Sequence, residues 1–394
     1  MANESEPQVS FEDSSTAFAH LSNGDLRFNY WIFRLMNNAG LTKFATSLAE
    51  FALSSRMPVR WAAKPTVFRV FCGGETISES ISVIEKLRES HVGAILDYSV
   101  EGQEKESDFA MTEQEIIRTI QLAKDNENIP VSCIKVSGIA SNGLLEKLST
   151  GSDLSSSDKE AAANLHQRFE RICRSAYEAN VPIYVDAEES WIQDAIDRLV
   201  ESMMPQFNSD KAIVFQTTQM FRHDRLEYLT QLILKGRREG FRIGNKIVRG
   251  AYLDKENARA AEQGYPTPIQ LSKQATDDAY NAALQLCIEN IDIVEICAGT
   301  HNEYSSIYLT QLLNEKGLDK NPPHVYFSQL YGMSDYMSFN LAAAGYNVSK
   351  YLPYGPVRST LPYLIRRAKE NTAIAGQMGK EYSMILKEIN RRKS

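Results

Sequence analysis

Two adjacent arginines near the C-terminal end of the chain have the spacing of an anion-binding face. In the segment YLPYGPVRSTLPYLIRRAKEN at residues 351–371, helical spacing puts Tyr363, Arg366, Arg367 and Glu370 on one side of a helix. Because guanidinium groups bind carboxylates in a planar, bidentate geometry, this face could hold a small anion, with Glu370 as a brace. Ser359 or Thr360 is expected to cap the start of this helix. A solvated, salt-bridged surface helix is the alternative interpretation.

Other side chains that could bind a ligand or take part in a reaction lie in or just after short apolar runs elsewhere in the chain. Lys135 lies in the run at residues 131–136, where a buried ammonium needs either an anion or a shifted pKa. Asp186 follows the run at 182–185, and we interpret its neighbours Glu188 and Glu189 as caps of the next helix. His301 comes after another run, beside polar neighbours, and is predicted to donate a hydrogen bond to a cofactor.

The apolar runs indicate the element type that positions these groups. Eight runs alternate with helical segments along most of the chain, at residues 93–96, 131–136, 182–185, 212–215, 246–248, 293–298, 325–327 and 348–352. Eight buried strands, each followed by a helix, predict an α/β fold with a closed (βα)8 TIM-like barrel. An open doubly wound sheet is the alternative, and no glycine-rich dinucleotide motif follows the first run.

In a barrel, the residues at the carboxyl ends of all strands converge on one mouth. The polar residues predicted at this mouth are Asp97, Glu101, Lys135, Asp186, Gln216, Gln219, Lys246, Arg249, Tyr252, Thr300, His301, Asn302, Gln329 and Tyr351. Burying so many polar groups without a ligand would be costly, so we expect a binding site there. The small pair Gly250 and Ala251, beside Arg249, would let backbone N–H groups approach a phosphate.

Composition excludes several classes. The chain has 394 residues, 43% hydrophobic and 24% charged, with a net charge of −7, which argues against general attraction to nucleic acid or acidic lipid. Its five cysteines form no CxxC pair, and its six histidines form neither HxH nor HExxH, so neither a disulfide framework nor a metal is predicted. With no long apolar run and no basic leader, a cytoplasmic protein is predicted.

Three parts of the chain are predicted. Residues 1–90 would form a polar tail and a helical arm, with the apolar residues of 26–55 covering one end of the core. Residues 91–372 would form the barrel, and residues 373–394 a basic C-terminal tail. The tail is interpreted as a solvated terminal helix, and the second hypothesis is a basic amphipathic patch in peripheral contact with the inner face of a membrane.

Four stretches together resemble the proline dehydrogenase family, which are flavoproteins with a (βα)8 barrel. They are KIVRGAYL at 246–253, YVDAEES at 184–190, CAGTHN at 297–302 and the segment at 351–371. The resemblance covers residues 93–371 in order and implies FAD-dependent oxidation of L-proline to Δ1-pyrroline-5-carboxylate, with a hydride passing from C5 to flavin N5. It also implies a membrane quinone as acceptor and a possible hand-off of product to a pyrroline-5-carboxylate dehydrogenase.

The resemblance implies a role for each matching residue. Arg366, Arg367 and Lys135 would hold the substrate carboxylate, and Tyr351, Tyr363, Ile247 and Tyr252 would surround the ring and flavin. Asp186, placed with Lys246 among the catalytic residues, would orient Tyr351, while Glu370 braces Arg367 and Glu101 gates the pocket by meeting Arg366. Lys246 would lie near flavin N5, where many bacterial members have arginine. The flavin would be held by Ala187, Gln216, Val248, Arg249, Gly250, Ala251, Thr300, His301 and Gln329.

Three alternatives stay open. A hydroxyproline dehydrogenase is the nearest alternative. Tyr351 argues against it, because this side chain would crowd a hydroxyl group on the ring, and related enzymes that act on hydroxyproline resemble this pattern with a smaller residue at that position. A Schiff-base aldolase would use Lys135 or Lys246 as its nucleophile. A non-catalytic binding barrel is disfavoured by the many converging ionisable groups.

Overall fold

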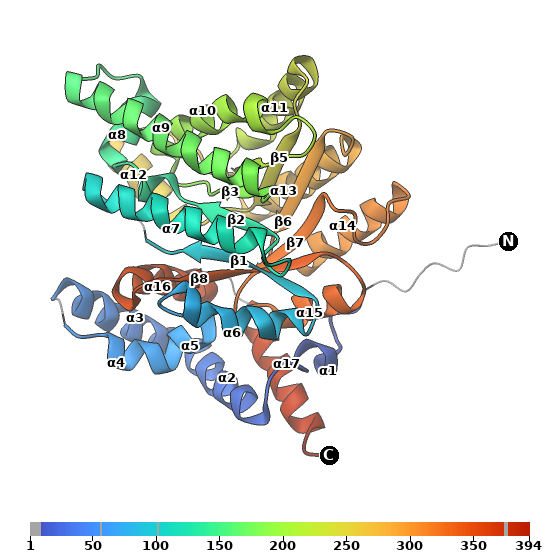
Figure 1. Ribbon diagram of the computed structural model, residues 1–394. Helices are drawn as coiled ribbons and strands as arrows, with labels where there is room; N and C mark the ends of the chain where they lie inside the picture. The colour runs from blue at the N-terminus through green and yellow to red at the C-terminus, as the bar shows by residue number, and fades with distance from the viewer. Residues whose placement is uncertain (1–8, 56, 101, 374–376) are drawn as a thin grey trace. The chain divides into compact units, whose positions relative to one another are not determined.

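The computed structural model describes residues 9–55, 57–100, 102–373 and 377–394, and confirms the predicted barrel (Figure 1). Eight parallel strands close in the order β1 to β8. The strands are β1 Val92–Tyr98, β2 Val131–Ile134, β3 Ile183–Val185, β4 Val214–Gln219, β5 Ile243–Val248, β6 Val294–Gly299, β7 Val325–Leu330 and β8 Val348–Tyr354. Each overlaps an apolar run seen in the sequence, and no boundary differs by more than four residues.

Helices follow or precede these strands. Before the barrel come α1 Ser14–Ala17, α2 Asn23–Met36, α3 Ala39–Ser54, α4 Arg60–Ala63, a π-helical turn Lys64–Phe68, α5 Arg69–Phe71 and α6 Ile77–Arg88. Around it lie α7 Glu106–Lys124, α8 Asn142–Thr150, α9 Ser156–Ala179, α10 Ser190–Phe207, α11 Arg225–Glu239, α12 Leu253–Gln263, α13 Lys273–Glu289, α14 Glu303–Glu315, α15 Asp335–Ala343 and α16 Val357–Ala373. A 3-10 turn, Val136–Gly138, follows β2, and α17 Gln377–Arg391 ends the chain.

The chain divides into two compact units, each with its own packing. Unit 1 comprises residues 1–99, 301–307 and 327–394, and unit 2 comprises residues 100–300 and 308–326. In unit 1, β1 pairs with β8 from Val92 opposite Val348 to Tyr98 opposite Tyr354, and β7 continues this sheet beyond β8. In unit 2, β2 to β6 pair in sequence. Strands this thoroughly buried are expected where helices cover a parallel sheet.

Local sequence explains some helix boundaries but not others. Asn38 is the N-cap of α3 and accepts from the Leu41 N–H at 3.1 Å. The expectation that Ser359 or Thr360 caps α16 was wrong. That helix already begins at Val357, after the turn at Gly355 and Pro356, so both residues lie inside its first turns.

The described residues near both ends of the chain are more closely packed than the sequence suggested. Phe11 and Phe18, in the segment expected to be a loose tail, are buried in unit 1. Helix α17 packs against α1 and α2 of the same unit and buries Met384 and Ile385. These two apolar residues of the C-terminal helix are therefore already covered by protein, whereas Leu386 is 36% exposed. Among the described residues, no helix is both long and apolar enough to cross a membrane.

Candidate active site

In unit 2, one carboxylate joins the two lysines that the sequence singled out. Lys135 directly follows β2, Asp186 directly follows β3, and Lys246 lies in β5. The Lys135 Nζ lies 3.3 Å from one oxygen of Asp186, and the Lys246 Nζ bonds to the other. All three side chains are buried, with no more than 9% of any residue exposed.

This arrangement has an electrostatic consequence. Two ammonium groups share the Asp186 carboxylate in a buried place, where charged groups need partners. The two cations could also bind an anionic ligand. Asp186 also occupies both lysines as ion-pair partners, one on each of its oxygens.

A second group in unit 2 surrounds Arg249, just after β5. Its guanidinium donates to Thr300 Oγ1 and to Asp277, each at 2.6 Å, and stacks 4.3 Å from the Tyr280 ring centroid. Burial alone would raise the pKa of the Asp277 carboxyl, but hydrogen bonds from Lys273 and Arg249 outweigh it and lower that pKa. Arg249 and Thr300, predicted to bind one cofactor, are thus in contact.

The turn after β5 comes close to the end of β4. Gly250 has φ +138°, and a Cβ atom there would lie 2.4 Å from the Phe221 ring, so only glycine fits without displacement. Gln219 bridges the two strand ends: its side chain accepts from the Ala251 N–H at 3.4 Å and donates to the Glu188 carbonyl at 2.8 Å. Gly250 itself is exposed, at the position where the sequence predicted a phosphate contact.

Gln216 is the one predicted cofactor ligand of unit 2 with an unsatisfied buried atom. Its amide nitrogen donates to Asp197, while its Oε1 is buried without a hydrogen-bond partner. A buried acceptor left unpaired costs about 1–3 kcal/mol. A ligand N–H group would remove that cost.

In unit 1, the predicted substrate wall comes from β8 and α16. Tyr351 and Tyr363 are buried, and the Arg366 guanidinium lies 5.8 Å from the Tyr363 ring centroid. Tyr363 and Arg366 are three residues apart on α16, so they lie on the same side of that helix, as predicted. The predicted gate residue Glu101 and the side chains of Arg367 and Glu370 lie outside the described residues.

The two predicted cofactor ligands of unit 1 are held by the first turn of α15. Ser334, in the left-handed conformation (φ 50°), precedes that helix but does not cap it with its side chain. Its hydroxyl instead lies 2.9 Å from His301 Nδ1. One turn later, the Ser338 hydroxyl donates to Gln329 Oε1 at 2.8 Å. These contacts fix the ring of His301 and the amide orientation of Gln329.

Helix α17 holds this turn in place. The backbone N–H groups of Ser334 and Asp335 donate to the buried Glu381 carboxyl, whose Oε2 has no hydrogen-bond partner, so this side chain takes the place of the missing cap of α15. The preceding residue, Lys380, lies 2.8 Å from Glu303, two residues after His301. Asp335 in turn pairs with the fully buried Lys350 of β8 at 2.7 Å.

Glu381 gives the protein a defined pH dependence. Burial and the nearby Asp335 raise the pKa of its carboxyl from 4.5 to about 8, while Lys350 opposes the shift. A raised carboxyl pKa means that the folded state holds a proton which the unfolded state has lost. We therefore expect the free energy of unfolding to fall by a few kcal/mol between about pH 4.5 and pH 8 from this group. Urea unfolding across that range measures it.

Two variants separate this effect from other titrations. Glu381→Gln keeps an acceptor for the α15 amides without the titrating proton, so the loss of stability with rising pH should become shallower. Glu388→Gln, one heptad later on α17, removes a carboxyl bound to Arg391 and Arg392 at 2.8 and 2.7 Å and should leave that decline in place. Equal slopes in wild type and Glu381→Gln would contradict the assignment.

Other side chains differ from the sequence interpretation. Glu188 and Glu189 do not cap α10 with their side chains. Glu188 instead accepts from the Ser137 N–H at 2.9 Å, and Glu189 pairs with Lys255 at 2.6 Å. Ser334, Ser338 and Glu381 were missed, because single serines and one glutamate in an amphipathic helix carry no sequence signal.

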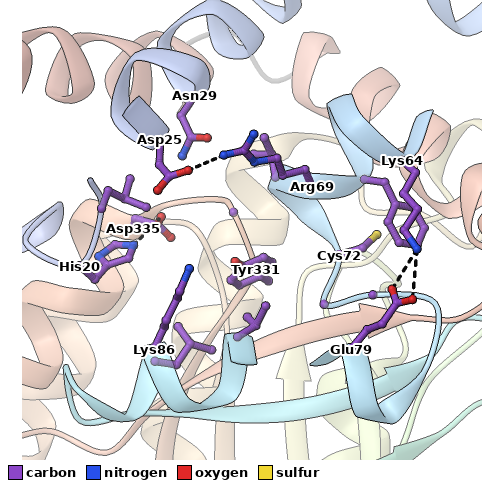
Figure 2. A pocket seen from close by; sticks show the side chains of 18 of the residues that line it. His20, Asp25, Asn29, Lys64, Arg69, Cys72, Glu79, Lys86, Tyr331 and Asp335 are labelled. Atoms are coloured by element: carbon purple, nitrogen blue, oxygen red, sulfur yellow. Dashed lines mark hydrogen bonds and ion pairs between the residues drawn. The ribbon is translucent and has the colours of Figure 1, made fainter. Parts of the chain in front are cut away.

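Unit 1 also contains a cavity of about 380 Å³ that none of the predicted site residues lines (Figure 2). Its charged walls are largely paired, with Asp25 2.6 Å from Arg69 and Glu79 3.1 Å from Lys64. His20 lies 3.8 Å from Asp335 and stacks on Phe339. Burial lowers the pKa of this histidine to about 4, so it is neutral at physiological pH.

The closed barrel with charged side chains following its strands defines a (βα)8 protein with the features of an enzyme. A sequence model of the family described as proline dehydrogenase matches residues 80–380, which is most of the chain. The chain therefore belongs to the proline dehydrogenase family, as the sequence motifs indicated.

Individual relatives agree with this assignment. Proline dehydrogenase 1, mitochondrial, of Dictyostelium discoideum is 31% identical over 96% of this chain and 74% of its own length. Hydroxyproline dehydrogenase of Xenopus laevis is 29% identical over 98% of this chain and 90% of its own. The carbapenem antibiotics biosynthesis protein CarD of Pectobacterium carotovorum is 34% identical over 82% of this chain and 84% of its own.

The fold has solved counterparts. Proline utilization A from Bdellovibrio bacteriovorus, crystallised after inactivation by N-propargylglycine, superimposes with a TM-score of 0.72 at 20% identity. The match covers 95% of this chain but only 40% of that longer protein. At this identity the likeness shows the barrel fold alone.

Proposed function

We propose that the chain is an FAD-dependent proline dehydrogenase that oxidises L-proline to Δ1-pyrroline-5-carboxylate and passes the electrons to a membrane quinone. Family membership supports the reaction class. The observation that carries the proposal is the buried set Lys135, Asp186 and Lys246, whose two ammonium groups suit the carboxylate of a small amino acid.

The residues present fit a flavin. The unpaired Gln216 Oε1 could accept from the single N–H of an oxidised isoalloxazine ring, and the amide nitrogen of the same side chain is already held by Asp197. Gly250 is exposed, so its backbone can approach a phosphate, and Arg249 beside it carries a positive charge. His301 and Gln329, held by α15, would be the ligands from unit 1. When bound, FAD would supply the two-electron acceptor for the substrate.

The protein's own residues have binding and positioning roles in this reaction. Arg366, Arg367 and Lys135 would bind the carboxylate, and Asp186 would keep Lys135 and Lys246 in place. The buried rings of Tyr351 and Tyr363 would exclude water from the pyrrolidine ring. Proline loses its amine proton and a hydride from C5, and a C5=N double bond forms. We propose that the proton goes to water or to a weakly basic neighbour.

Isotopic labelling tests which bond breaks. Proline deuterated at C5 should be oxidised more slowly than unlabelled proline, because the C5–H bond breaks, whereas deuterium at C2 should have little effect. The measurement is kcat/KM for the three substrates with a water-soluble electron acceptor. Slowing by C2 deuterium and none by C5 deuterium would replace the proposed product with a different imine.

Hydroxyproline oxidation is the second candidate, favoured by the Xenopus laevis relative. The large Tyr351 side chain, which is only 7% exposed, argues for the unsubstituted ring. Comparison of kcat/KM for proline and 4-hydroxyproline separates the two. The Schiff-base alternative is disfavoured because both candidate lysines are ion-paired with Asp186. Passage of the product to a pyrroline-5-carboxylate dehydrogenase remains part of the proposal.

A further inference from the structure

Helix α3 is packed with its apolar side outward. Leu41, Phe44, Leu48 and Phe51 recur at i, i+3, i+7 and i+10 and share one face. They are 49%, 69%, 55% and 62% exposed, respectively. The sequence predicted that this face would cover the core, so the orientation is the reverse of the expectation.

Small polar residues occupy the inward side of the same helix. Thr42 and Thr46 are each only 6% exposed, and their hydroxyls donate at 2.9 Å to the carbonyls of Met36 and Thr42. On this side α3 packs against α16, and Arg358 of α16 donates to the Leu53 carbonyl at 2.6 Å. The inward side is satisfied by protein contacts, whereas the apolar side meets none of the described elements closely enough to be buried.

Neighbouring elements extend the apolar character. Trp31 and Leu35 of α2, Met57, and Trp61 of α4 are 50% to 78% exposed. Half of the large hydrophobic residues exposed in the described chain therefore lie between residues 31 and 61. A monomeric soluble protein rarely concentrates exposed apolar residues in this way without a partner.

The charge of this segment differs from that of the whole protein. Residues 27–64 contain six basic residues and one acidic residue, a net charge of +5 in a chain of net charge −7: Arg27, Arg34, Lys43, Arg56, Arg60, Lys64 and Glu50. Arg60 and Lys64 pair with Glu75, but Arg34 and Lys43 are exposed and form no ion pair with any described residue. The overall negative charge thus hides a cationic segment.

We infer that the outward face of α3, with Trp31, Trp61 and the adjacent cations, docks on the surface of an anionic lipid bilayer. Leu and Phe on one face of an amphipathic helix, tryptophans beside it and basic residues around it are the features of interfacial helices. A second copy of the chain could also cover this apolar face, but an anionic lipid surface accounts better for the positive charge around it. The inference rests on the proposed function in one respect, which is the use of a membrane quinone. A quinone dissolves in the lipid, and docking through α3 would place that lipid against the helix that packs on α16.

Vesicle binding of the full chain tests the inference. We expect binding to vesicles of phosphatidylcholine with phosphatidylglycerol that weakens with added salt, and much weaker binding to phosphatidylcholine alone. Phe44→Ser combined with Phe51→Ser should reduce partitioning by about tenfold or more. Arg34→Gln combined with Lys43→Gln should reduce the preference for anionic vesicles by about tenfold. Leu271→Ser, at a fully exposed leucine of unit 2, is the matched control and should change neither.

Fluorescence gives a readout that does not depend on activity. The chain has three tryptophans, so Trp191→Phe leaves only Trp31 and Trp61, whose emission should shift to the blue on vesicle binding. Unchanged vesicle binding in the phenylalanine variant would overturn the inference. The inference would also be overturned if the full chain formed a dimer and the phenylalanine variant lost that dimer but kept lipid binding. That result would identify a second copy of the chain as the partner of this face. A chain that binds vesicles as expected but does not oxidise proline would instead refute the proposed function.

Discussion

Asp186→Asn should lower both stability and activity more than any other single change considered. The substitution keeps the volume but removes the one carboxylate that lies between the buried ammonium groups of Lys135 and Lys246. Breaking a buried ion pair by removing one partner costs about 3–5 kcal/mol because a buried charge is left uncompensated. We expect a loss of that size in the free energy of unfolding, measured with urea.

Activity should fall as well, by about 10²-fold or more in kcat/KM, because both lysines lose the group that orients them. Asp292→Asn is the control, since it removes a carboxylate from an exposed pair with Arg237 and should cost about 0.2–1 kcal/mol with no change in kinetics. If Asp186→Asn were as stable and as active as the Asp292 variant, the three-residue set would have no role in either fold or chemistry.

Replacing the arginines of α16 should chiefly weaken substrate binding. A hydrogen bond to a charged group is worth about 1.5–3 kcal/mol. Arg366→Met or Arg367→Met should therefore raise KM for proline by about tenfold to a hundredfold, with a smaller effect on kcat. Steady-state kinetics with a soluble acceptor provide both parameters.

The same helix offers a matched control. Arg358→Met removes an exposed guanidinium bound to the Leu53 carbonyl and should leave KM unchanged. Arg366→Lys should lie between wild type and the methionine variant, because lysine keeps the charge but not the bidentate geometry. An unchanged KM in both methionine variants would show that the carboxylate is bound elsewhere.

The barrel was predictable because its signal is repeated. Eight apolar runs separated by helical segments constrain the fold many times over, so errors at single boundaries do not matter. Boundary details failed where two local signals competed. At the start of α16, Pro356 and Gly355 set the turn, and the hydroxyl residues three positions later only look like caps.

Site residues could be predicted where the residue type itself is unusual for its place in the sequence. Lys135 and Asp186 stood out because ionised residues are rare beside apolar strand runs, and the structure brings them into contact with Lys246. The residues that position His301 and Gln329 were not predictable. Ser334 acts through a left-handed backbone and Glu381 through a contact across 46 residues, and neither leaves a pattern in sequence.

The orientation of α3 could not be predicted for a different reason. Helical periodicity shows that a helix has two faces but not which one turns inward, and hydrophobic residues are assigned to the core by default. Here Thr42 and Thr46 are the buried residues. The cationic composition of residues 27–64 was visible in the sequence, but the net charge of the whole chain concealed it.

The most direct test is the visible spectrum of the purified chain before and after L-proline is added without oxygen. A chain that binds proline through its buried cations and oxidises it with FAD should be yellow, and its flavin absorbance should bleach with proline. Arg366→Met should need a higher proline concentration to bleach. A colourless protein, or a yellow one whose spectrum does not respond to proline, would contradict this assignment.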